Sequence, residues 1–423
     1  MSSSFLNAEA RIRLQIIWRA GAVFFAAALC PRAASAAETY FVPGVEGGAE
    51  YHSDLSLQGG SSSATDEESA EGYFAALWAI AGVRSPRAFV ELKPRVRFQE
   101  YPDHEDLEKS NEYLDLHTGY DTVRSSFELV GSYRNEDEIR AEIADAEFDD
   151  FDPDDPIVDE AGRVERFGGT RTRIQVRPDY TYQLSQLLGV GASALYQTVT
   201  YDFPSDFGST SRQDYDYWTG DGFLTWTLSP RTRLRTGAYV TKYETDDGLN
   251  QTDGTGASLE IRHEWSETLT AMAAVSAQQT DIERAALTAE DSSTDAGFTI
   301  GIESRGQVSQ WRINVGRTFN PTGSGTLNET DQVRLQYDRN LTERLQFTGA
   351  VRANRSRPLG VNASDNDRDF FRTDIACSWS MTRTWSVNGG YSYIQEQFEG
   401  ESGDRSDNMV TISVRYQGLP PQP

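Results

Sequence analysis

The chain is built of short segments in which apolar and polar side chains alternate residue by residue, from residue 40 onward. In the segment 333–338, Val, Leu and Tyr occupy the odd positions, and Arg, Gln and Asp occupy the even positions. A period of two residues is that of a β-strand, whose successive side chains point to opposite faces. The same alternation indicates strands elsewhere, for example in residues 90–98, 173–182, 371–379 and 409–416.

The links between these segments alternate between short and long. Residues 85–87 and 382–384 are short links, whereas residues 135–168 and 203–214 are long and polar. Short turns at one end and long loops at the other are typical of an outer-membrane barrel. We therefore predict an all-β fold: a transmembrane antiparallel β-barrel of about 18 strands with short periplasmic turns and long extracellular loops.

The polar face of the segments argues against a soluble β protein. A β-sandwich or a propeller needs a dry interior, but one face here carries Arg, Gln, Asp and Glu on nearly every segment. A polar inside and an apolar outside is the arrangement that lipid requires. Aromatic residues next to the short links predict a girdle at the periplasmic interface: Trp226, Trp265, Trp311, Trp379 and Trp385.

The N-terminus has the pattern of a secretory signal peptide. Arg11, Arg13 and Arg19 form a positive region, residues 21–29 are apolar, and residues 34–36 (Ala-Ser-Ala) fit a small-x-small cleavage site. We expect cleavage after residues 1–36, which leaves residues 37–423 as a single barrel domain in the bacterial cell outer membrane.

Charge and histidine content bear on other functions. The chain has 39 Lys and Arg against 65 Asp and Glu, a net charge of −26, so we expect no nucleic acid as a partner. Among its four histidines, His117 has Ser125 and Ser126 nearby across a turn. This is a weak match to a Ser-His-Asp site, and we predict that the protein is not an enzyme.

Arginines recur on the polar face of the predicted strands. Rings of arginine attract anions and offer fork-shaped donors to carboxylates and sugar hydroxyls. Alternatively, they pair with acidic residues of the same face, such as Glu303 and Asp374. The residues that we predict to line the lumen are Arg95, Arg97, Arg173, Arg177, Arg233, Arg235, Arg262, Arg312, Arg334, Arg352, Arg372 and Arg415.

The long link 135–168 contains the most acidic part of the chain. Residues 136–165 hold 14 acidic and two basic residues. The spacing resembles the opening of an EF-hand loop, but Ala161 stands where the closing Glu is required. We expect no cofactor beyond loosely bound Ca²⁺, and the loop either lies solvated outside or folds inward as a plug or gate. The candidate gate or Ca²⁺ residues are Asp149, Asp150, Asp152, Asp154 and Asp155.

Three stretches resemble a family of large bacterial β-barrels associated with exopolysaccharide and capsule gene clusters. They are residues 45–57, with Tyr51 and Asp54 before the first loop, residues 134–140, and residues 177–201. The resemblance implies an outer-membrane channel for export of a polysaccharide, working with a periplasmic polysaccharide-export protein.

Two alternatives remain open: a general or substrate-specific diffusion porin, and a structural or adhesive surface barrel. We expect a monomer surrounded by outer-membrane lipid and lipopolysaccharide. The barrel-assembly machinery is a further expected partner, although the tail after Tyr416 departs from the aromatic end of many barrels.

If the acidic segment gates the lumen against the arginines, deleting residues 141–159 raises the conductance severalfold. Planar-bilayer recordings of the correctly inserted barrel measure this change. An unchanged conductance would contradict the gate.

Overall fold

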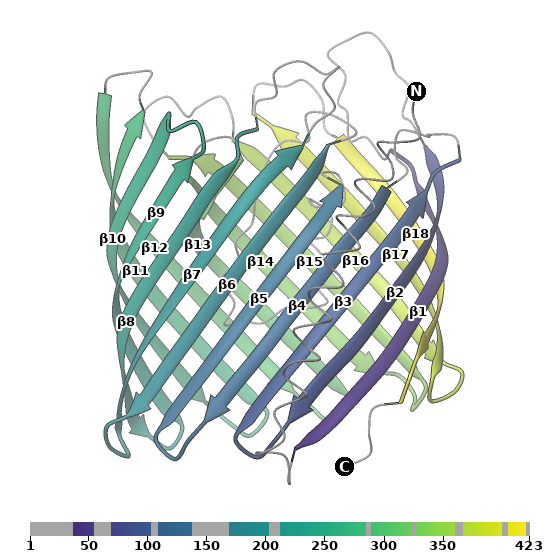
Figure 1. Ribbon diagram of the computed structural model, residues 1–423, viewed down its shortest axis with the longest axis horizontal. Helices are drawn as coiled ribbons and strands as arrows, with labels where there is room; N and C mark the ends of the chain where they lie inside the picture. The colour runs from purple at the N-terminus through teal and green to yellow at the C-terminus, as the bar shows by residue number, and fades with distance from the viewer. Residues whose placement is uncertain are drawn as a thin grey trace.

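The computed structural model is a closed barrel of 18 antiparallel strands (Figure 1), as the alternation predicts. The structure describes residues 37–54, 69–102, 109–137, 169–202, 212–284, 289–323, 327–359, 367–399 and 405–419. The predicted signal peptide and most of the acidic link lie outside these residues. Among the described residues, no helix is long and apolar enough to span a membrane.

Each strand has 13 to 17 residues. The strands are β1 (Glu38–His52), β2 (Ala70–Arg84), β3 (Ala88–Glu100), β4 (Lys109–Asp121), β5 (Ser125–Asp137), β6 (Thr170–Gln183), β7 (Leu188–Asp202), β8 (Tyr215–Ser229), β9 (Thr232–Thr245), β10 (Asn250–Glu264), β11 (Leu269–Arg284), β12 (Ala289–Arg305), β13 (Ser309–Pro321), β14 (Leu327–Asn340), β15 (Leu345–Pro358), β16 (Arg368–Ser380), β17 (Trp385–Phe398) and β18 (Arg405–Gln417).

The barrel closes where β18 pairs with β1, from Gly44 opposite Gln417 to His52 opposite Met409. Every other strand pairs with its neighbours in the sequence. The short turns therefore share one end of the barrel with the start of β1 and the end of β18, and the long links share the other (Figure 1). We refer to these as the periplasmic and extracellular ends.

The pairing between β12 and β13 extends over fewer residues than the pairing between other neighbouring strands. β11 and β12 pair over 16 residue pairs, but β12 and β13 pair over only eight, which end at Phe298 opposite Arg317. Above this point β13 continues to pair with β14 as far as Pro321 opposite Leu327. The extracellular ends of β13 and β14 therefore separate from β12.

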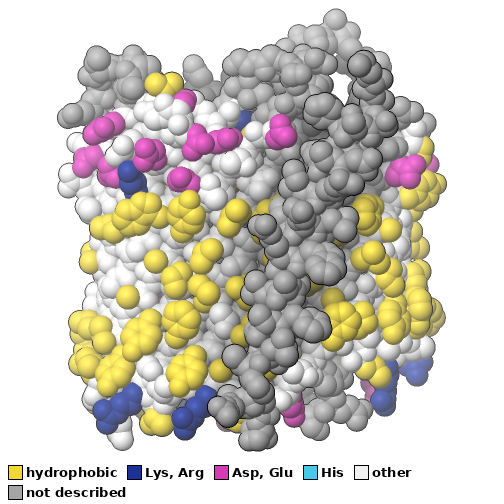
Figure 2. Space-filling model, in the orientation of Figure 1, with side chains coloured by type: hydrophobic (Ala, Val, Ile, Leu, Met, Phe, Trp, Pro, Cys, Tyr) yellow, Lys and Arg dark blue, Asp and Glu magenta, His cyan; other side chains and the backbone are white. Residues whose placement is uncertain are grey.

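The two faces of the wall differ in polarity because side chains alternate along each strand. Apolar residues on the outer face remain exposed, for example Leu77 (55%), Ile375 (48%) and Ile412 (59%). Figure 2 shows them as an apolar belt, with acidic side chains above it and Lys and Arg at its lower edge. This is the outer surface of a barrel that sits in a bilayer, and the localisation is the outer membrane.

The predicted aromatic girdle is present at the periplasmic end. Trp265, Trp379 and Trp385 are 63%, 51% and 44% exposed beside the short turns. Trp385 also packs against Tyr416, with ring centroids 5.1 Å apart. Such amphipathic rings favour the membrane–water interface and so fix the depth of this end.

The belt predicts a depth-dependent penalty for charge. Ile412→Arg places a guanidinium on the outer face near the middle of β18 and should lower the free energy of unfolding by about 2–4 kcal/mol. Its neighbour Thr411 faces the lumen, so Thr411→Arg is the matched control. We expect it to lower the free energy of unfolding much less. Chemical denaturation in lipid vesicles measures both, and equal losses would contradict the assignment of the two faces.

Candidate functional site

All twelve arginines that the alternation predicts inside the barrel occupy lumen-facing positions. The register pairs them with other residues of the inner face, while the exposed apolar residues alternate with them on the outside. Their placement follows from the strand period alone. Their role in binding a solute is not tested by placement and stays a prediction.

Three of these arginines form a row across neighbouring strands. Arg334 on β14 lies opposite Arg352 on β15, which lies opposite Arg372 on β16. Like charges directly opposite one another destabilise a sheet unless anions compensate them. Asp374 accepts bonds of 2.8–2.9 Å from Arg372, and the Arg352 guanidinium lies 5.8 Å from the Phe370 ring centroid. The row therefore brings three guanidinium groups together on one wall, with Asp374 as the carboxylate that compensates Arg372.

A second row crosses β3 to β6. Arg95 lies opposite Tyr113, Tyr113 opposite Arg134, and Arg134 opposite Arg173. The Arg95 guanidinium stacks over the Tyr113 ring at 5.5 Å. Arg134 is not among the twelve arginines predicted from the sequence, because it directly precedes the long polar link. Its even position on β5 is nevertheless a lumen-facing position by the same alternation.

Buried ion pairs line the extracellular half of the lumen. Glu50 accepts bonds from Arg97 (2.8 Å) and the Tyr101 hydroxyl (2.5 Å). Glu136 lies 3.1 Å from Arg171, and these two side chains are 0% and 2% exposed. On the described strands, the buried lumen-facing charges comprise seven arginines and four carboxylates: Arg97, Arg171, Arg173, Arg352, Arg368, Arg372 and Arg405, with Glu50, Glu136, Glu396 and Asp407.

The periplasmic half is more open. Arg235, which is 37% exposed, lies 2.9 Å from Asp221 and stacks over Phe223 at 3.6 Å. Arg312 bonds to Glu303 at 3.1 Å, so part of the alternative pairing with inner-face acids is confirmed. The Arg415 guanidinium lies 4.6 Å from the Trp78 ring centroid. In the described lumen, charged side chains are thus half-exposed in the periplasmic half and buried in the extracellular half.

Thr322 and Gly323, the described residues of the link between β13 and β14, reach into the extracellular mouth. The Tyr243 hydroxyl donates to the Thr322 carbonyl at 2.9 Å, and the backbone N–H of Gln213 donates to the Gly323 carbonyl at 2.8 Å. In the wall, β10, β11 and β12 separate β9 from β13. Since Tyr243 faces the lumen, Thr322 lies on the inner side of the wall.

An apolar cluster forms under this link, which we call the mouth cluster. Its side chains come from β7, β8, β9, β11 and the ends of β14 and β15, and Tyr215 and Tyr243 are fully buried in it. The inner wall therefore has one region in which apolar side chains gather into a small core. The cluster consists of Leu195, Val199, Tyr215, Tyr217, Tyr243, Ile282, Leu327 and Leu359, with Tyr201 and Phe319 packed against it.

The sequence placed the candidate plug elsewhere, in the acidic link 135–168. Its residues Asp149, Asp150, Asp152, Asp154 and Asp155 lie outside the described residues, so the acidic gate stays a prediction. No sequence pattern predicts that the residues around Thr322 turn inward. A contact between a loop and tyrosines some 80 residues away leaves no local signal in the sequence.

The histidines form no Ser-His-Asp arrangement in the described chain. His117 Nε2 lies 2.6 Å from Glu128, while the Ser126 hydroxyl donates to Asp121. His52 Nδ1 lies 2.7 Å from Asp407, whose other oxygen accepts from the Ser53 hydroxyl. Within the described residues, no group of three or more His, Cys, Asp or Glu could hold a metal ion.

Comparisons with known proteins add a likeness in architecture. No family model matches the chain, and no curated protein matches it. Among solved structures, the barrel is similar to OccAB3 of Acinetobacter baumannii (10% identity, TM-score 0.45, 90% of this chain and 99% of that chain). It is also similar to the copper transporter OprC (9%, 0.46, 92% and 82%) and to OccK2 of Pseudomonas aeruginosa, solved with glucuronate (9%, 0.45, 90% and 99%).

At these identities and TM-scores the likeness concerns the barrel alone. The association with exopolysaccharide gene clusters, which the sequence resemblance implies, finds no support in these comparisons.

The mouth cluster predicts a narrowed pore. Tyr243→Ala removes both the bond to Thr322 and the ring beneath the link, so the single-channel conductance and its noise should rise. Tyr239→Ala is the matched control, because Tyr239 lies on the same strand and the same face but outside the mouth cluster. Planar-bilayer recordings measure the conductance; equal values for both variants would show that the link does not limit flow.

Proposed function

We propose that this barrel is an outer-membrane diffusion channel that favours small anionic solutes. The observation that carries the proposal is the pair of arginine rows, Arg334–Arg352–Arg372 on one wall and Arg95–Arg134–Arg173 on another. The chain as a whole is strongly acidic, so this concentration of positive charge belongs to the lumen and not to the average surface.

Arginine suits such a route for two reasons. Its guanidinium stays charged at any physiological pH, and its planar fork matches a carboxylate or phosphate with two parallel bonds. A charged lining inside low-dielectric walls also raises the local concentration of ions of opposite sign. Several moderate sites in succession let an anion enter and still leave.

The size of the pore supports small solutes. A barrel of 16–18 strands leaves an aqueous channel inside, but the β13–β14 link occupies part of the extracellular mouth. This narrowing favours a diffusion channel over a conduit for a hydrated polymer. Polysaccharide export and the adhesive surface barrel remain predictions from the sequence.

Ion selectivity tests the proposal. Replacing both Arg334 and Arg352 with Gln should lower the anion-to-cation permeability ratio about fivefold, since losing roughly 1 kcal/mol of attraction for an anion corresponds to that factor. Reversal potentials in a KCl gradient measure the ratio. Arg339→Gln is the matched control: Arg339 lies on the same strand as Arg334 but faces outward.

A wild-type channel that prefers cations, or a double variant with unchanged selectivity, would contradict the anionic route. Deletion of the gene in its native host distinguishes the diffusion channel from a conduit for polysaccharide export. Loss of secreted polysaccharide, restored by a plasmid-borne copy, would favour the conduit. Unchanged polysaccharide together with swelling of barrel-containing liposomes in small organic anions would favour the diffusion channel.

A further inference from the structure

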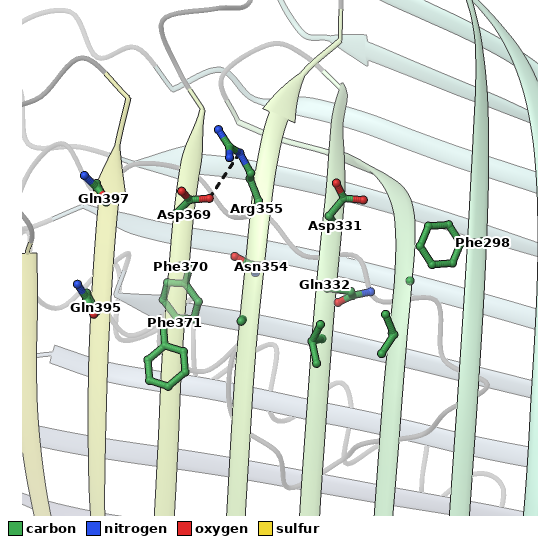
Figure 3. Close-up of a pocket in the computed structure, with 14 residues that line it drawn as sticks. Phe298, Asp331, Gln332, Asn354, Arg355, Asp369, Phe370, Phe371, Gln395 and Gln397 are labelled. Carbon is green, nitrogen blue, oxygen red and sulfur yellow. Dashed lines mark ion pairs between the residues drawn. The ribbon is translucent and has the colours of Figure 1, made fainter.

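A groove of about 560 Å³ lies on the outer surface of the wall, across β12 to β17 (Figure 3). Val333, Ala353 and Phe371 lie opposite one another on outward-facing positions and form its apolar row. Gln395 continues this row on β17. The next row toward the extracellular end is polar and consists of Asp331, Arg355, Asp369 and Gln397, with Phe298 at its β12 side. The groove therefore straddles the boundary between the apolar belt and the extracellular rim.

At the rim above the groove, three arginines stand among the acidic side chains Glu329, Asp331, Asp367, Asp369 and Glu399, which contact them. Outward-facing side chains at the extracellular ends of the described strands are mostly acidic, as the band in Figure 2 shows. Among them the basic residues are Lys242 on β9 and three arginines at the groove: Arg317, Arg355 and Arg357. The acidic members elsewhere are Glu71, Glu100, Glu112, Asp137, Asp202, Asp216, Glu244, Asp253, Asp281 and Glu283.

The three arginines are held to different degrees. Arg317 donates two parallel bonds of 2.7 Å to Asp331, a geometry that fixes both side chains. Arg355 makes only longer contacts, at 3.3 Å to Asp367, 3.6 Å to Asp369 and 3.8 Å to Glu399, and its side chain is 44% exposed.

Arg357 resembles Arg355 in this respect. It lies 3.3 Å from Asp367 and 3.6 Å from Glu329, and its side chain is 41% exposed. An arginine has five N–H donors. Because these contacts are long and the two guanidinium groups are exposed, some of their donors can bond to a phosphate. Arg355 and Arg357 are thus oriented by carboxylates and directed along the outer surface.

We propose that the groove binds one phosphorylated glycolipid of the outer leaflet, of the lipid A class. An acyl chain packs against Phe298, Val333 and Phe371 over Ala353. A phosphate group accepts hydrogen bonds from Arg355 and Arg357. The amides of Gln395 and Gln397 and the carboxylates Asp331 and Asp369 bond to the hydroxyl and amide groups of the sugar.

Two observations favour a glycolipid over a glycerophospholipid. The groove lies toward the end with long links, and that end faces the outer leaflet, where lipopolysaccharide is the main lipid. The polar strip also extends from β14 to β17: Arg355 lies in it among carboxylates and two glutamines, and Arg357 follows two residues beyond Arg355 on β15. One phosphate needs only a basic contact, whereas a phosphorylated disaccharide uses donors and acceptors along the whole strip.

Binding of purified lipid A to barrel refolded in detergent tests the proposal. Native mass spectrometry counts the bound lipids during a titration. We expect one saturable site, with affinity about tenfold weaker in the double variant Arg355→Ala/Arg357→Ala, which loses two charge-assisted contacts. Ala353→Trp, which fills the groove from the lipid-facing side, should weaken binding similarly. Lys242→Ala, a rim cation on another part of the wall, should bind as the wild type does.

Equal affinity in all four proteins would overturn the site. Equal displacement of lipid A by phosphatidylglycerol would overturn the choice of a glycolipid, and displacement by millimolar inorganic phosphate alone would overturn the role of the groove. Heat-dependent migration in gels confirms that each variant is folded. Reversal potentials of the same variants should stay at the wild-type value, so this inference and the anion channel can fail separately.

Discussion

The structure depends on one constraint: inside a bilayer, every backbone N–H and C=O must be bonded within the protein. Pairing of β18 with β1 removes the last open edge of the sheet. Once the wall is closed, the period of two assigns alternate residues to lipid and to the lumen. The apolar belt, the periplasmic girdle and the inner arginines all follow from that assignment.

Closure also concentrates charge. Guanidinium groups that would be spread over the surface of a soluble protein are brought together on the inner wall, where Arg334, Arg352 and Arg372 lie opposite one another. Asp374 offsets part of this repulsion by accepting bonds from Arg372. Elsewhere on the inner wall, Glu50 accepts a bond from Arg97, and Arg415 lies over the ring of Trp78.

The strand period made the wall predictable and left its contacts with loops unpredictable. The strand number, the turns and the inward direction of twelve arginines depend on neighbouring residues in the sequence. Arg134, Arg171, Arg368 and Arg405 were missed because strand ends merge into polar links. The contact of Tyr243 with Thr322 and the groove at Phe298 depend on where distant segments meet, which no local pattern records. Most of the acidic link lies outside the described residues, so its role stays a prediction.

The early separation of β13 from β12 links the outer groove to the narrowed mouth. Above Phe298 and Arg317 the same pair of strands, β13 and β14, departs from its neighbour and carries the link that reaches Tyr243. The groove on the lipid side and the narrowing on the water side therefore share one hairpin, β13–β14. If the groove holds a lipid as proposed, that lipid and the narrowed mouth are coupled through this hairpin, and such a coupling is reciprocal. The composition of the outer leaflet would then be a variable in the permeability of the channel.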